Sequence, residues 1–305
     1  MNVTRYICCP KCHSDVKKIK AAYVCEKCSF TMPIYQGIIR SLQTQSSDIT
    51  LSQEKWNVMY KKIIQNRTYM KEYREYKRDY LAETVNNLNA TCSLKNCVYL
   101  EIGCGPMYVG QYYAKECKVV LGVDISIDAL LLARSFFIKN KIKNFLLIQA
   151  DIRSMPIKNN VTDFIYGGGV IEHFHDTSSA LWELHRVLVP KGICFNTVPL
   201  LNIGSLTYRQ VWGNIPNIPV VRQLAEFIHI KLLGAKHMRF GYEMSFPKSL
   251  LLSLHKNVGF RKVLIQKYDV TLRFEYLPSY IRAPFIYLAK NSPLFWPMVK
   301  VIAMK

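Results

Sequence analysis

The sequence predicts an α/β protein built on a doubly wound, mostly parallel sheet of seven strands, with a small cysteine-rich module ahead of it. From residue 98 onward, short apolar runs alternate with helix-like segments, which is typical of strand–helix–strand units. Glycines interrupt the chain where the first apolar run ends. Two Cys-x-x-Cys pairs lie within the first 28 residues.

The best-defined unit begins with the apolar run Val98–Ile102, which we predict to be a buried strand. Gly103-Cys104-Gly105-Pro106 ends that strand, and a helix is predicted from Val109 to about Cys117. A second apolar run, Val119–Val123, leads to Asp124. Glycines at such a turn let the backbone approach a ligand closely, and a carboxylate at the tip of the next strand is placed to bind a ribose diol. The stretch therefore predicts a nucleoside-binding unit.

The remaining elements follow from the same patterns. Leu51–Asn89 lacks glycine and proline and is predicted to be helical, and residues 43–50 are predicted to be a linker. The other predicted helices are Ala129–Ile138 with Ser126 as N-cap, Ser178–Leu188, Val220–Leu232, and one from Pro247 to about Lys256. The other predicted strands are Asn144–Ala150, Val161–Val170, Ile193–Val198 after a turn at Pro190-Lys191-Gly192, Arg261–Val270 and Met298–Met304.

The cysteine pairs predict a zinc ribbon. Cys9 and Cys12 form one pair, Cys25 and Cys28 the other, and twelve residues separate the pairs. This spacing places four thiolates around one tetrahedral Zn²⁺. Cys8 is interpreted as a bystander, with His13 as an alternative ligand. Because so small a module buries little apolar surface, the metal is expected to supply most of its folding free energy, and Cys25→Ser is expected to unfold the ribbon and leave the core folded.

The run Glu101-x-Gly103-x-Gly105 resembles motif I of class I S-adenosylmethionine-dependent methyltransferases, whose domain is a Rossmann-like, seven-stranded sheet. With the later runs DFIYGGGVIEHF and LHRVLVPKG, the resemblance spans about residues 97–200 and is close to the small-molecule type. It implies that Glu101 braces the loop, that Asp124 binds the ribose and that Asp151 accepts a hydrogen bond from the adenine amino group. The implied cofactor-binding set is Glu101, Gly103, Cys104, Gly105, Asp124, Ile125, Asp151, Ile152 and Gly168. Met107 stands where the family often has a third glycine.

Residues 7–42 resemble the zinc-ribbon domain related to methyltransferase activator subunits, and are also similar to the zinc finger of rRNA guanine methyltransferases, which usually includes a histidine ligand. We therefore predict a zinc ribbon over 1–42 and a methyltransferase domain over 51–305. Within the latter, 51–95 is a helical extension and 200–245 is an insertion on the side of the methyl acceptor.

Charge is distributed unevenly along the chain. The net charge is +20; residues 96–200 hold 10 basic and 9 acidic side chains, whereas residues 201–305 hold 15 and 4. A basic last third favours an anionic partner such as RNA, a lipid headgroup or an acidic metabolite, although a solvated lysine-rich surface has the same composition. No charge-free apolar run reaches the roughly 20 residues of a membrane span, and the N-terminus lacks an apolar signal core, so we expect a cytoplasmic protein.

The predicted function is methyl transfer from S-adenosylmethionine to a small-molecule, lipid or glycan acceptor, with structural Zn²⁺ in the ribbon and peripheral membrane contact left open. RNA base methylation is the alternative, and a non-catalytic binding subunit is the second. The retained cofactor set argues against the second. His173, just after the fourth strand, is the candidate catalytic base, with His175 and Glu172 behind it. Residues 220–233 and the aromatic, proline-rich segment 276–297 are expected to wall an apolar acceptor pocket.

Overall fold

The computed structural model describes residues 1–42, 47–206, 215–232, 243–268 and 278–305. The chain forms two compact units. The first comprises Met1–Gly167, Ser179–Cys194 and Met304–Lys305, and the second comprises Gly168–Ser178 and Phe195–Ala303.

The first unit is organised around four parallel strands in the order β7-β6-β5-β8. Their bounds are β5 Val98–Ile102, β6 Val119–Asp124, β7 Phe145–Gln149 and β8 Thr162–Gly168. Every residue of β5 and β6 is buried, as expected for strands covered on both faces. Parallel strands end at the same edge, so the predicted loops after β5, β6 and β7 lie together at the carboxyl edge of this sheet.

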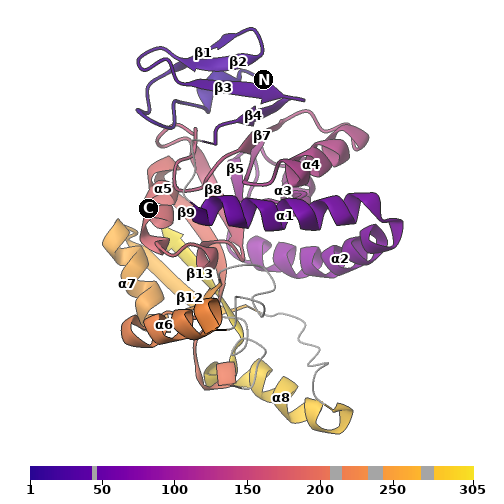
Figure 1. Ribbon diagram of the computed structural model, residues 1–305, viewed down its shortest axis with the longest axis vertical. Coiled ribbons are helices and arrows are strands. Elements are labelled where there is room, and N and C mark those ends of the chain that lie inside the picture. Colours follow the sequence, from indigo (N-terminus) through magenta and orange to yellow (C-terminus); the bar gives the residue numbers. More distant parts are fainter. Residues whose placement is uncertain (43–46, 207–214, 233–242, 269–277) are drawn as a thin grey trace. The chain divides into compact units, whose positions relative to one another are not determined.

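The ribbon extends that sheet (Figure 1). Its strands β1 Val16–Ile19, β2 Ala22–Cys25, β3 Thr31–Tyr35 and β4 Ile38–Arg40 are antiparallel to one another. β4 then pairs in parallel with β7, with Ile39 opposite Ile148 and Arg40 opposite Gln149. The ribbon is therefore hydrogen-bonded to the strand that leads to Asp151.

Two helices, not one, precede β5. They are α1 Ser47–Gln65 and α2 Arg67–Asn89, and the break falls at Asn66. α1 begins inside the segment predicted to be a linker, so that prediction is wrong for Ser47–Thr50, while residues 43–46 lie outside the described part. α1 packs on α4 (Ile127–Lys139) through a buried cluster that includes Tyr60, Ile63, Ala129 and Leu132.

The short helix α3 (Tyr108–Tyr113) ends earlier than predicted and is preceded by Met107 in a left-handed conformation, φ 56° and ψ 46°. Glycine adopts this conformation at little cost, whereas a residue with a side chain does so less readily. Met107 is fully buried, and its side chain occupies the space beside Gly110 and Gly122. The two glycines thus accommodate the larger residue.

This packing predicts that Gly122→Ala destabilises the protein. The new Cβ would lie 2.6 Å from Sδ of Met107 and 3.0 Å from a methyl carbon of Leu147. We expect a loss of about 1–3 kcal/mol in the free energy of unfolding, which urea denaturation would measure. Met107→Ala should relieve the clash in the double variant. If the double variant is as unstable as the sum of the two single changes, Met107 is not the obstacle.

Helix α5 (Thr177–Val187) passes directly into β9 (Leu188–Pro199). The predicted turn at Pro190–Gly192 is therefore part of the strand, although Lys191 has a positive φ of 68°. Lys305 closes this end of the first unit: its Nζ donates to the carbonyl oxygens of His185 (2.6 Å) and Leu188 (2.8 Å). A cation at a helix C-terminus satisfies carbonyls that lack helical partners.

The second unit contains the later strands and helices. In it, β13 (Met298–Met304) lies between β9 and β12 (Lys262–Lys267), so the seven predicted core strands are all present. The remaining elements are β10 Ile215–Pro216, α6 Pro219–Glu226, a π-helix Phe227–Leu232, β11 Met244–Ser245, α7 Lys248–Val258 and α8 Ser279–Asn291. Among the described residues, no helix is both long and apolar enough to span a bilayer.

Candidate functional site

The loop after β5 is held from below by Glu101. This carboxylate is 5% exposed, and its Oε2 accepts hydrogen bonds from the amide of Gly110 (2.7 Å) and the hydroxyl of Tyr99 (3.1 Å). Glu101 therefore joins the end of β5 to the start of α3. Because Gly103 and Gly105 have φ values of 52° and 50°, a residue with a Cβ would strain the turn at either position.

Asp124 ties the same loop to the end of β6. Its Oδ2 accepts from the amide of Gly105 (2.7 Å) and its Oδ1 from the amide of Ser126 (2.8 Å). Burial raises the pKa of Asp124, and the amides of Ser126, Gly105 and Ile125 oppose that rise. A carboxylate has about four acceptor positions, so at least one stays available for a ribose hydroxyl.

Asp151 follows β7 and forms an ion pair with Arg153. The guanidinium donates from Nη2 to Oδ2 (2.8 Å) and from Nε to both carboxylate oxygens, and the Arg153 amide donates to Oδ1. Ile152 beside it is buried. The carboxylate is thus held in one orientation, with its side chain still 18% exposed.

Cys104 is buried, and its thiol donates to the carbonyl of Gly105 at 3.6 Å. Burial raises its pKa well above the ordinary value, and nearby Asp124 and Glu101 add to the effect. The group is therefore a neutral thiol that packs beneath the loop. Ile125 is partly exposed just beyond Asp124.

One side chain that the sequence did not single out for the site is Tyr60 of α1. A Cβ placed on Gly105 would be only 2.5 Å from the Tyr60 hydroxyl, so this helix lies directly against the glycine turn. Trp56 stacks on Tyr60 with a centroid distance of 6.2 Å. The sequence carries one signal for it: aromatic residues recur along the predicted helix, and this pattern does not distinguish Tyr60 from the others. They are Trp56, Tyr60, Tyr69, Tyr73, Tyr76 and Tyr80. The side chains of Tyr69, Tyr73 and Tyr76 lie outside the described part.

The four predicted metal ligands come together. Sγ of Cys9 lies 3.5 Å from Sγ of Cys28, Sγ of Cys12 lies 3.5 Å from Sγ of Cys25, and all four sulfurs lie within 4.8 Å of one another. Tetrahedral zinc with Zn–S bonds of about 2.3 Å requires sulfur separations near 3.8 Å, so the cluster fits a structural Zn²⁺ site. The amides of Lys27 and Cys28 point at Sγ of Cys25, both at 3.4 Å, which stabilises a thiolate.

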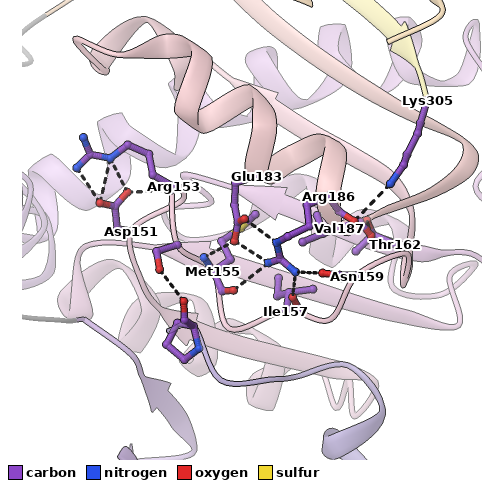
Figure 2. A network of polar contacts seen from close by, with 12 residues as sticks. Asp151, Arg153, Met155, Ile157, Asn159, Thr162, Glu183, Arg186, Val187 and Lys305 are labelled. Carbon is purple, nitrogen blue, oxygen red and sulfur yellow. Dashed lines mark hydrogen bonds and ion pairs between the residues drawn. The ribbon is translucent and has the colours of Figure 1, made fainter. Parts of the chain in front are cut away.

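A polar network joins the Cys9–Cys12 segment of the ribbon to the loop that follows β7 and contains Asp151 (Figure 2). Ser154 donates to the carbonyl of Pro10, which lies between the first two cysteines, at 3.2 Å. The buried ion pair of Glu183 and Arg186 then holds the rest of the loop: Glu183 accepts from the amide of Met155 (2.7 Å), and Arg186 donates to the carbonyl of Ile157 (2.8 Å).

Gly168 and His173 belong to the second unit. Gly168 is the last residue of β8, and His173 ends the 3₁₀ helix Ile171–His173. His173 is partly exposed, and Glu172 before it is buried. Their place relative to the loops of the first unit stays a prediction.

Residues 100–196 match a methyltransferase domain family. Among curated relatives, malonyl-[acyl-carrier protein] O-methyltransferase from Hamiltonella defensa is 28% identical over 47% of this chain and 54% of the relative. The enzyme of the same name from Salmonella typhimurium is 32% identical over 39% and 45%. The chain therefore spans about half the length of the curated relatives it matches.

Two solved structures share the fold. A complex between the Haloferax volcanii Trm112 methyltransferase activator and a methyltransferase gives a TM-score of 0.56 at 11% identity, over 83% of this chain and 96% of that one. Magnesium protoporphyrin IX methyltransferase from Synechocystis PCC 6803, with bound S-adenosylhomocysteine, gives 0.54 at 13%, over 85% and 100%. The predicted resemblance to class I methyltransferases, the fold class and the cofactor are confirmed. The individual cofactor contacts stay predictions.

Proposed function

We propose that this chain, which has the class I methyltransferase fold behind a four-cysteine cluster, transfers the methyl group of S-adenosylmethionine to a small-molecule, lipid or glycan acceptor. The observation that carries the proposal is the loop after β5, which is held by hydrogen bonds to two carboxylates. Glu101 and Asp124 hold both sides of a glycine turn while leaving acceptor capacity on Asp124. A turn preorganised in this way binds a nucleoside with little loss of conformational entropy.

The activity named for the curated relatives supports the choice of acceptor, because a malonyl group attached to a carrier protein is an acyl compound with a free carboxylate. The reaction is an in-line displacement at a carbon activated by a sulfonium, so positioning supplies much of the rate. If the acceptor is a hydroxyl or amine, a base has to remove its proton, and His173 is proposed for that role. A cytoplasmic location also stays a proposal.

The direct test is a labelling experiment. A lysate is separated into RNA, lipid, glycan and small-molecule pools, and each pool is incubated with the protein and S-adenosylmethionine that carries a tritiated methyl group. Label that enters one of the last three pools, and that falls with His173→Gln if a base is needed, supports the proposal. Absence of label from every pool, together with retained cofactor binding, would instead favour the non-catalytic binding subunit.

RNA methylation is the second candidate, favoured by the excess of 15 basic over 4 acidic side chains in residues 201–305. Not all of these cations are free. Arg222 is paired with Glu226 at 2.9 Å and donates to the carbonyl of His175, whereas Lys231 is exposed. Lys236 and Arg239 lie outside the described residues. The described basic side chains that are exposed in this unit are Lys231, Lys248, Lys256, Arg261, Lys262 and Lys290.

We expect binding of total RNA to be weak and to change little between 50 mM and 200 mM salt. Contacts to several phosphates would release counterions and reduce affinity by about a hundredfold or more over this range. Filter binding measures the effect, with charge reversal at Lys231, Lys262 and Lys290 as the test of specificity and Arg222→Glu as a variant that removes an internal ion pair instead. A steep salt dependence abolished by the three reversals would make RNA the substrate.

The expected acceptor wall is only partly reflected in the described residues. α6 presents its apolar side chains to solvent: Val220 is 79% exposed and Leu224 is 61% exposed. Residues 279–291 of the proline-rich segment form helix α8, in which Tyr280 and Tyr287 are exposed. Closure of these segments over an acceptor therefore stays a prediction.

A further inference from the structure

Glu172 is a buried carboxyl group that the proposed function does not yet use. Its side chain is 2% exposed, and Oε2 has no hydrogen-bond partner among the described residues. Buried polar groups are nearly always paired, and an unpaired one costs stability. A protein that keeps such a group in a loop beyond a strand end is expected to use it.

The carboxyl lies against the backbone of that loop. Gly169 has a φ of 68°, and a Cβ placed there would be 3.4 Å from Oε1 of Glu172. The Gly169 amide donates to the carbonyl of Thr197 in β9 at 3.1 Å, which fixes the loop beside the next strand. In doubly wound sheets, ligands bind just outside the carboxyl ends of the strands, which is where Gly169 and Glu172 follow β8.

The electrostatic surroundings favour the uncharged acid. Burial raises the pKa of Glu172 well above its ordinary value, and the carboxylate of Glu243, just before β11, raises it further. His173 is the next residue of the same 3₁₀ helix. No lysine or arginine among the described residues offsets the negative charge. These surroundings favour the protonated form of the carboxyl, which is a hydrogen-bond donor.

We propose that Glu172 belongs to the acceptor site and donates a hydrogen bond, as a neutral acid, to the carboxylate of an acyl methyl acceptor. This inference rests on the proposed methyl transfer and names its acceptor class. A donor in that place holds the oxygen that is not methylated and leaves the other oxygen free to react. A neutral group there also avoids repulsion between two anions.

The chemistry balances without a proton acceptor. The carboxylate oxygen forms a bond to the methyl carbon, the carbon–sulfur bond breaks, and its electron pair returns to sulfur. An anion and a sulfonium cation become a neutral ester and a neutral thioether. Because no proton leaves the acceptor, Glu172 keeps its own proton throughout.

The test compares Glu172→Gln, which retains an N–H donor of the same shape, with Glu172→Leu, which removes the donor. Activity is measured with tritiated-methyl S-adenosylmethionine on malonyl-acyl carrier protein, a malonyl thioester and a long-chain fatty acid. We expect kcat/KM of Glu172→Gln to stay within about fivefold of wild type. We expect kcat/KM of Glu172→Leu to fall by about 10- to 100-fold, mainly through a higher KM, because hydrogen bonds to charged groups are stronger than those between neutral groups. Asp176→Asn, an exposed acid in the same segment, is the matched control.

Each outcome decides between roles. If Glu172→Gln loses activity as Glu172→Leu does, Glu172 acts as a proton acceptor and the donor role is overturned. Full activity of Leu would overturn any role in the acceptor site. A wild-type protein that binds the cofactor but methylates none of the carboxylates would refute the proposed acceptor class, and this inference with it.

Stability gives an independent prediction. The unfolded chain ionises Glu172 near pH 4.3, whereas the folded chain keeps the proton to higher pH, so above pH 4.3 the unfolded state binds fewer protons and stability falls as pH rises. Glu172→Gln should therefore become progressively more stable than wild type as the pH rises above 4.3 in urea denaturation. Glu183→Gln, which breaks a buried ion pair, should be less stable than wild type at neutral pH. If Glu172→Gln is also less stable there, Glu172 is a structural residue.

Discussion

Cys25→Ser will release the ribbon's zinc, and the loss will extend into the methyltransferase sheet. Structural zinc contributes about 10–16 kcal/mol of apparent binding free energy to small zinc-finger peptides at pH 7, and a four-strand ribbon has little else to replace it. We therefore expect wild-type protein to carry about one zinc per chain and the variant to carry almost none, as measured by elemental analysis of anaerobically prepared protein.

The contacts explain why the core should respond, which differs from the expectation drawn from the sequence. β4 supplies the strand that covers the edge of β7, and its residues Ile38 and Ile39 are buried. Ile7, which forms a bridge with Ile157, is buried as well. Unfolding the ribbon would expose that apolar surface and the unpaired edge of β7. Amide hydrogen exchange in Phe145–Gln149 should consequently increase in the variant.

Cofactor binding should weaken as well, because the loop that contains Asp151 is hydrogen-bonded to the ribbon. The Ser154 hydroxyl in this loop donates to the carbonyl of Pro10, between Cys9 and Cys12. Calorimetry with S-adenosylhomocysteine is expected to show a loss of tenfold or more. Cys92→Ser, a partly exposed cysteine outside the cluster, is the control and should retain both zinc and affinity. Unchanged affinity and unchanged exchange in a zinc-free Cys25→Ser protein would show that the ribbon and the sheet are energetically independent.

The parts of the fold that depend on local pattern were predictable from the sequence. β5, β6 and α4 were predicted because mostly apolar runs and an N-cap serine specify them within a few residues. Ser126 does accept from the amide of Ala129 at 3.3 Å. The metal cluster was predictable from spacing alone, because two Cys-x-x-Cys pairs at this separation are typical of a zinc site. Motif I was identified from its resemblance to the methyltransferase family, and the roles of Glu101 and Asp124 at the cofactor stay predictions.

The parts that depend on contacts between distant segments were not predictable. Pairing of Ile39 with Ile148 is a choice of register between strands more than 100 residues apart, and no local signal encodes it. The break at Asn66 lacks glycine or proline, so a propensity argument passes over it. α8 forms although Pro284 lies inside it, against the usual reading of proline as a helix breaker. Tyr60 reaches the glycine turn only because α1 packs on α4.

Asp124→Ala should be the most damaging single change at the cofactor site that leaves the fold intact. The carboxylate is 8% exposed and already bound to the amides of Gly105 and Ser126, so its orientation needs no adjustment when a ribose arrives. If Asp124 binds the ribose as proposed, removing it deletes a charge-assisted contact to the cofactor and frees the Gly105 amide. We expect a loss of about 2–3 kcal/mol, or roughly 30- to 150-fold in affinity for S-adenosylmethionine, measured by calorimetry.

A double-mutant cycle separates the ribose contact from loosening of the loop. The analogue S-adenosylhomocysteine lacking the ribose 2′-hydroxyl should bind wild type more weakly than the parent compound does, whereas Asp124→Ala should bind both alike. Asp128→Ala removes an acid four residues further on, in the first turn of α4, and serves as control. If the deoxy analogue loses as much affinity with Asp124→Ala as with wild type, the hydroxyl is bound elsewhere. Asp124 would then act only by holding Gly105 in place, and the ribose carboxylate would have to be sought on another residue of the loops after β6 and β7.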